Sequence, residues 1–138
     1  MTPTPPTPAA PWPVQLPVRD LIAFVQALLP MPVHDLPTGT AVPAEKSPVL
    51  LDVREAWELQ AARLDLAGAR SLHIPMGTLP ARLHELDRLQ PILVLCHHGA
   101  RSLQCVTFLQ RQGFERAYNV AGGIDAWSRE VDGTVPRY

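Results

Sequence analysis

The sequence predicts a doubly wound α/β domain, in which a mostly parallel sheet carries helices on both faces. Three observations lead to this expectation. Short apolar runs alternate along the chain with segments whose apolar residues recur at helical spacing. The runs at residues 49–53 and 92–95 are almost wholly apolar, which is typical of strands buried on both faces of a parallel sheet. With 138 residues, the chain is long enough for one domain with a substantial core.

The first 17 residues differ in composition from the rest of the chain. They contain seven prolines and no charged residue. Proline fixes the backbone and removes a hydrogen-bond donor, so we expect this segment neither to pair into a sheet nor to form a helix. The sequence therefore predicts a flexible proline-rich leader at residues 1–17 and a folded domain at residues 18–138.

Charge, hydropathy and cysteine usage exclude several classes of partner and cofactor. The net charge is −1 without a long basic block, which argues against nucleic acid as the main partner. No segment resembles a secretory signal or is long enough to cross a membrane, so we expect no membrane partner and a cytoplasmic location. Cys96 and Cys105 form no zinc-type pattern, so we expect free thiols, no metal and no cofactor.

The first half of the domain contains one strand between two helices. Residues 18–29 have apolar side chains on one helical face, and Pro30 ends that helix. Residues 31–48 are rich in proline and predict a loop. The apolar run at 49–53 predicts a buried strand, and residues 54–61 favour a helix.

The second half repeats this alternation. The sequence predicts strands at residues 71–74, 92–95 and 117–120, and helices at 79–89, 101–112 and 124–130. Gly113 is expected to end the helix before it, and Gly122 and Gly123 are expected to form a turn. In such folds the ligand site lies at the carboxyl ends of the strands, where Cys96, Asp52 and Arg54 are found.

Three blocks of the sequence resemble those of a single-domain rhodanese. They are Leu-Leu-Asp-Val-Arg-Glu at 50–55, Cys-His-His-Gly-Ala-Arg-Ser at 96–102, and the stretch from 113 to 127 that contains Gly122-Gly123. They occur in the order and at the separations usual in that family. The chain departs from the family at residues 62–69, where the usual His and Pro of a Gly-His-Ile-Pro-Gly-Ala stretch are missing. The resemblance implies a sulfurtransferase with Cys96 as its catalytic nucleophile.

The loop after Cys96 has the chemistry that sulfur transfer needs. A helix N-terminus and a nearby cation favour the reactive thiolate. Backbone N–H groups of residues 97–102 are expected to surround the sulfur, and Gly99 permits the required curl. Arg101 is expected to supply a fixed charge that orients an anionic donor. The expected binding loop is thus His97, His98, Gly99, Ala100, Arg101 and Ser102.

The implied reaction moves a sulfane sulfur in two steps. The Cys96 thiolate attacks the outer sulfur of thiosulfate or a related anion, sulfite leaves, and cyanide or a thiol then takes the sulfur from the persulfide. A protein thiol is a further candidate acceptor. Asp52 and Arg54 are expected to form an ion pair that ties the strand end to the cysteine loop. His97 and His98 are expected to add partial positive charge and to shape the donor pocket rather than to bind a metal.

Alternative functions remain open at this point. The domain could be a persulfide carrier or a partner-docking module with weak turnover of free donor, because proline-rich segments are recruited by aromatic grooves. A cysteine phosphatase or arsenate reductase is disfavoured, because only four residues separate Cys96 from Arg101 where phosphatases have five. Cys105 is expected to be a small hydrophobic residue of a helix, with a resolving thiol as the alternative.

Overall fold

A computed structural model describes residues 14–28 and 47–138. Within this part the strands form a five-stranded sheet in the order β1-β5-β4-β2-β3. All of its pairings are parallel, and β4 is buried along its whole length, which confirms the predicted fold class. The strands are β1 (Val14–Pro17), β2 (Val49–Asp52), β3 (Arg70–His73), β4 (Ile92–Leu95) and β5 (Ala117–Ala121).

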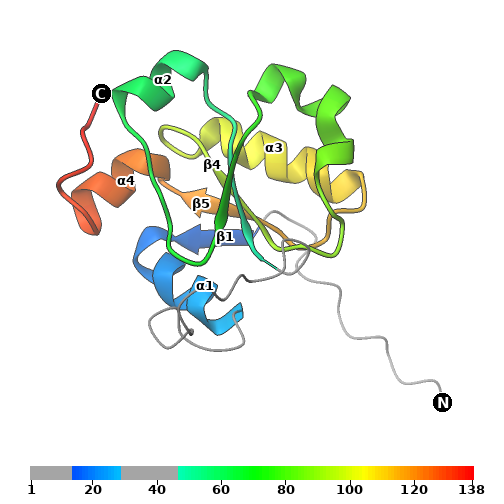
Figure 1. The fold of residues 1–138 in the computed structure, drawn as a ribbon, viewed down its shortest axis with the longest axis horizontal. Coiled ribbons are helices and arrows are strands. Elements are labelled where there is room, and N and C mark those ends of the chain that lie inside the picture. The colour runs from blue at the N-terminus through cyan, green and yellow to red at the C-terminus, as the bar shows by residue number, and fades with distance from the viewer. Residues whose placement is uncertain (1–13, 29–46) are drawn as a thin grey trace, which may run out of the picture.

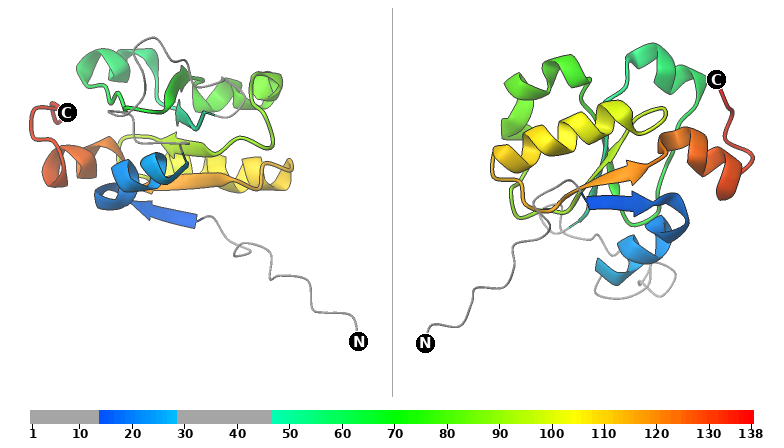
Figure 2. Two further views of the ribbon diagram at one scale, coloured as in Figure 1. Left: turned by 60° about the horizontal axis from the view of Figure 1, so that its bottom comes forward. Right: turned by 180° about the vertical axis from the view of Figure 1, so that it is seen from behind.

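Helices cover both faces of this sheet, because alternate residues of the central strands face opposite sides. Leu50, Leu93 and Leu95 pack in a cluster with residues of α1 and α4. Leu51 and Val94 pack in a second cluster with residues of η3 and α3, and α3 lies in front of the sheet when the molecule is seen from behind (Figure 2, right). The helical elements are η1 (Val18–Asp20), α1 (Leu21–Leu28), α2 (Ala56–Ala61), η3 (Met76–Glu85), α3 (Ala100–Arg111) and α4 (Gly123–Glu130).

The first strand corrects the predicted leader. Residues 14–17 pair in parallel with β5, so the prediction that no part of the segment up to Pro17 joins a sheet is wrong. An edge strand needs hydrogen bonds on one side only, which allows Pro17 to occupy it despite its missing donor. Leu16 is buried and anchors the strand to the core. Residues 1–13 of the predicted leader and most of the predicted loop at 31–48 lie outside the described residues.

The helix predicted at residues 79–89 differs in the structure. The chain there forms 3₁₀ turns over Met76–Glu85, with a kink at Arg82 and an extended backbone at Leu86. Pro80 lies inside this stretch and lacks the donor that a regular α-helix requires. Leu79 and Leu86 are nevertheless buried, so the apolar spacing correctly marked a core contact but not its conformation.

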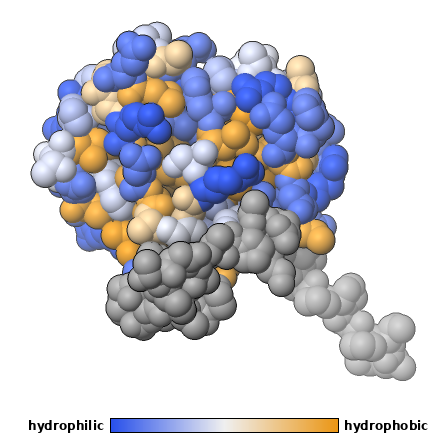
Figure 3. Space-filling view, in the orientation of Figure 1, coloured by the Kyte–Doolittle hydropathy of each residue, from blue (hydrophilic) through white to orange (hydrophobic). Residues whose placement is uncertain are grey.

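The other predicted elements agree with the structure within a few residues. Gly113 follows α3 with φ of 93°, as expected for the residue that ends a helix. Among the described residues, none of the helices combines the length and apolar character needed to span a bilayer. The face shown in Figure 3 mixes hydrophilic and hydrophobic residues.

Candidate active site

Cys96 lies directly after β4, at the edge of the sheet where the parallel strands end. The register pairs Leu95 with Asp52, so the residues that follow β2 and β4 are neighbours. The backbone N–H of Val53 donates to the carbonyl of Leu95 at 3.0 Å. Cys96 itself is only 1% exposed, so its sulfur lies at the base of the loop that leads into α3.

Two polar groups contact the Cys96 sulfur. The backbone N–H of Gly99 donates to Sγ at 3.0 Å, and Ser102 Oγ lies 3.1 Å from it. Ser102 Oγ also lies 2.5 Å from Asn119 Oδ1, and Asn119 Nδ2 donates to Gln15 Oε1 at 2.8 Å. A thiol can donate to Ser102 while Ser102 donates to Asn119. A thiolate can accept from the Gly99 N–H, but it competes with Asn119 Oδ1 for the single proton of the Ser102 hydroxyl.

The start of α4 holds the backbone of the cysteine loop. The N–H of Ile124 donates to the Cys96 carbonyl at 2.9 Å, and the N–H of Asp125 donates to the His97 carbonyl at 3.0 Å. This contact requires glycine at position 123, because a Cβ there would lie 2.5 Å from the Cys96 carbonyl oxygen. The predicted turn at Gly122-Gly123 is therefore also the point where β5 and α4 meet the loop.

Arg101 does not extend freely toward an incoming donor. Its guanidinium donates to both carboxylate oxygens of Glu58, each at 2.7 Å, and Glu58 is buried on α2. The Arg101 guanidinium lowers the pKa of Glu58 to about 2, and Glu58 in turn raises the pKa of Arg101. The two bonds use two of the five N–H donors of the guanidinium, which leaves donors for an anion.

This ion pair predicts a pH-dependent contribution to stability. Because the pKa of Glu58 falls from 4.5 to about 2 on folding, the contribution is present above pH 4.5 and is lost as the pH falls toward 2. The whole shift, to which the Glu55 N–H and the Tyr138 hydroxyl also contribute, corresponds to about 3 kcal/mol at about 1.4 kcal/mol per pKa unit. We expect Glu58→Gln to be less stable than wild type at pH 7, with a difference that shrinks between pH 4.5 and pH 2.

Urea unfolding of the two proteins across this pH range measures the difference directly. Other carboxylates, such as Asp125, also have a lowered pKa, but they are common to both proteins and cancel. A stability difference that stays constant down to pH 2 would contradict the assignment.

Asp52 and Arg54 form the predicted ion pair, but its partners differ from those expected. The Arg54 side chain is fully buried and donates to both Asp52 oxygens, with 2.7 Å for the shortest bond. Its other donors reach the carbonyls of Glu58 and Ala62 and the hydroxyl of Tyr138. The pair therefore fixes α2 to the end of β2 and touches the cysteine loop only indirectly, through Tyr138 and Glu58.

His97 and His98 stack on each other beside the loop. Their ring centroids are 3.8 Å apart, and the Tyr138 ring stacks on the other side of His97 at 3.9 Å. Burial, together with the neighbouring His98, lowers the pKa of His97. The neutral form of His97 is therefore favoured, which does not support the expectation that His97 adds positive charge to the pocket.

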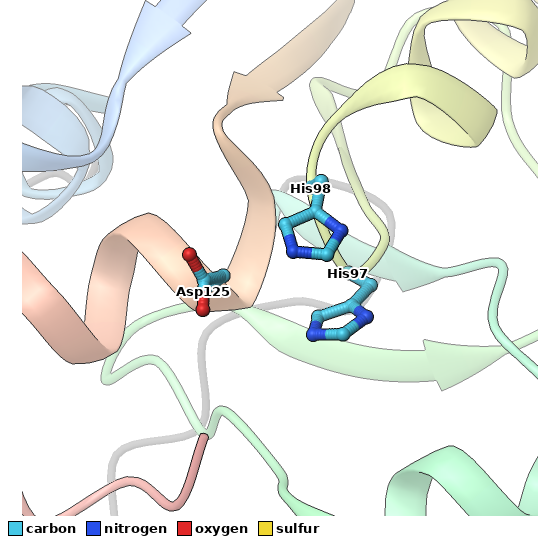
Figure 4. A group of neighbouring side chains, drawn as sticks. All are labelled: His97, His98 and Asp125. Carbon is cyan, nitrogen blue, oxygen red and sulfur yellow. The ribbon is translucent and has the colours of Figure 1, made fainter. Parts of the chain in front are cut away.

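The two histidines and Asp125 have potential metal-ligand atoms within 4.8 Å of one another, and Figure 4 shows the Asp125 carboxylate beside the two rings. The two Asp125 oxygens, however, accept hydrogen bonds from Arg129 and Arg137 at 2.9 and 3.0 Å. Two guanidinium groups already balance this carboxylate, so the group fits a bound cation poorly.

Cys105 lies on α3 inside the cluster that packs against η3. Burial, with a smaller effect of the nearby Cys96, raises its pKa to about 11. The thiol form is thus strongly favoured at neutral pH, which supports the interpretation of Cys105 as a core residue.

Three residues of the site were not identified from the sequence, namely Glu58, Asn119 and Tyr138. Glu58 carried one detectable signal, since it stands three residues after Glu55 and completes a capping box at the start of α2. Asn119 is a buried amide inside an otherwise apolar strand, which is a pattern that often marks a specific partner.

Comparison with known proteins identifies the same domain type. The model of the family "Rhodanese-like domain" matches residues 41–130. A thiosulfate sulfurtransferase GlpE of Vibrio cholerae is 30% identical over 69% of this chain and 86% of its own length. A rhodanese-like/PpiC domain-containing protein of Arabidopsis thaliana is 40% identical over 64% of this chain, but the match spans only 30% of that protein.

A solved structure agrees with these relatives. The solution structure of a polysulfide-sulfur transferase homodimer from Wolinella succinogenes is 28% identical to this chain, with a TM-score of 0.61. The match covers 86% of this chain and 74% of that protein.

Proposed function

The chain belongs to the family of rhodanese-like domains, and from this premise we propose that it transfers a sulfane sulfur through a persulfide on Cys96. The donor is thiosulfate or a related small anion, and the acceptor is cyanide or a thiol. The observation that carries the proposal is the environment of the Cys96 sulfur, which accepts from Gly99 at 3.0 Å and lies 3.1 Å from Ser102 Oγ.

The first step forms the persulfide. The Cys96 thiolate attacks the outer sulfur of thiosulfate, a new S–S bond forms, and the S–S bond of the donor breaks. Sulfite leaves with the bonding electron pair. The Gly99 N–H and the Ser102 hydroxyl stabilise the anionic sulfur. The N–H groups of Arg101 that do not bond Glu58 orient the oxygens of thiosulfate.

The second step returns the enzyme to its starting state. Cyanide or a thiolate attacks the terminal sulfur, and the S–S bond of the persulfide breaks. Cyanide leaves as thiocyanate, a thiol acceptor leaves as its own persulfide, and Cys96 is again a thiolate. Both cysteines of the chain are free thiols, which agrees with a protein that functions in a reducing compartment such as the cytoplasm.

A mass measurement tests the proposal. We expect the protein incubated with thiosulfate to gain the mass of one sulfur atom, and peptide mapping to place it on the peptide that contains Cys96. Addition of cyanide should remove this mass and release thiocyanate in equal amount. Absence of the adduct, or an adduct on Cys105 alone, would overturn the proposed mechanism.

A further inference from the structure

The segment that follows α4 returns to the neighbourhood of α2, where the C end of the chain is marked in Figure 1. Several hydrogen bonds fix its course. Ser128 Oγ donates to the carbonyl of Val135 at 2.5 Å, and Arg137 donates to Asp125 at 3.0 Å. These contacts bring the side chain of Tyr138 against the active site.

The Tyr138 hydroxyl connects the Arg54–Asp52 ion pair with the Arg101–Glu58 ion pair. The guanidinium of Arg54 can only donate hydrogen bonds, so its Nη1 is the donor and the Tyr138 hydroxyl oxygen is the acceptor, at 2.9 Å. The single hydroxyl proton is then directed to Glu58 Oε1, also at 2.9 Å. Together with Arg101 and the N–H of Glu55, which donates to Oε2 at 2.9 Å, this bond fixes both oxygens of the carboxylate that holds Arg101.

The Tyr138 ring packs against the cysteine loop at His97. It lies almost parallel to the His97 ring, with an angle of 8° between the planes and 3.9 Å between the centroids. The rings of Trp57 and Tyr138 pack in an edge-on arrangement, with an angle of 80° between their planes and 6.0 Å between their centroids. One side chain thus contacts the histidine directly after the nucleophile and is linked through Glu58 to Arg101.

We propose that Tyr138 is a positioning residue for sulfur transfer: its hydroxyl orients Arg101 through Glu58, and its ring fixes His97 beside Cys96. The kinetic part of this inference rests on the proposed function. The two halves of the side chain have separable effects, because phenylalanine removes the hydroxyl and keeps the ring, whereas leucine removes both.

The first measurement is steady-state turnover of thiosulfate with cyanide. We expect Tyr138→Phe to raise the KM for thiosulfate about 3- to 10-fold with little change in kcat, because the donor-binding charge is held less firmly while the nucleophile is untouched. We expect Tyr138→Leu to raise KM at least as much and also to lower kcat.

The second measurement is the titration of His97 by NMR, which is independent of turnover. His98, Asp125, Glu58 and Tyr138 surround this ring. Burial, the largest effect, lowers its pKa, so Tyr138→Leu is expected to shift the titration of His97 toward higher pH, while Tyr138→Phe leaves it close to wild type.

Tyr118→Phe is the matched control. Tyr118 lies near the start of β5, away from the carboxyl ends of the strands, and packs edge-on against Phe24 at 5.0 Å. If both Tyr138 variants keep the wild-type KM and His97 titration, as expected of Tyr118→Phe, the inference is overturned. If the wild-type protein gains no sulfur from thiosulfate, the proposed function itself is overturned. The role of Tyr138 in sulfur transfer is then overturned as well.

Discussion

Replacement of Cys96 by serine is expected to lower the turnover of thiosulfate by at least about 1000-fold, because removal of a covalent nucleophile leaves only the binding contributions of the site. A serine hydroxyl is not ionised at neutral pH and cannot form a persulfide. The Gly99 N–H and Ser102 Oγ can still bond the smaller side chain, so the loop is expected to keep its shape. Thiocyanate formation measures the loss, and thermal unfolding verifies that the variant is folded.

Cys105→Ala is the matched control for this experiment. Cys105 is as buried as Cys96, but it lies within α3 and its raised pKa keeps it protonated at neutral pH. We expect this variant to retain turnover within a few-fold of wild type, at the expense of some stability. A loss comparable to that of Cys96→Ser would show that Cys105 acts as a second thiol in the reaction.

The sequence predicted the centre of the fold better than its edge. The run at 92–95 is continuous, apolar and followed by a polar loop, which is typical of a strand buried on both faces of a parallel sheet. Strand β1 was missed because prolines dominate the composition around it. Its pairing depends on a tertiary partner, β5, that lies about 100 residues further along the chain.

In the candidate site, too, one part was predicted from the sequence and another part was missed. Cys96, Gly99 and Ser102 were identified because the loop that contains them is contiguous in sequence. The partners of that loop are remote, since Arg101 reaches Glu58 across 43 positions and Glu58 reaches Tyr138 across 80. No local pattern encodes such a contact, so the sequence predicted the charge of Arg101 but not its pairing with Glu58.

The second large effect concerns stability rather than activity. We expect Arg54→Met to lower the free energy of unfolding by about 3–5 kcal/mol, the usual result of removing one partner of a buried ion pair. Methionine fills much of the volume but leaves the Asp52 carboxylate without its counter-charge, and it leaves two buried carbonyls, of Glu58 and Ala62, without this donor. Domains of this size are typically stable by only about 5–15 kcal/mol, so the variant should unfold at markedly lower urea concentration.

Arg63→Met provides the comparison for this loss. Arg63 also pairs with an aspartate two residues away, Asp65, but at 3.8 Å and with the two side chains 62% and 79% exposed. Such a pair contributes about 0–1 kcal/mol, so its removal should scarcely change the urea midpoint. Each variant removes an arginine that pairs with an aspartate two residues away, so the difference between them measures what the buried setting of Arg54 adds, including its bonds to the carbonyls of Glu58 and Ala62. Equal midpoints for the two variants would mean that the Arg54 pair does not hold α2 to the sheet.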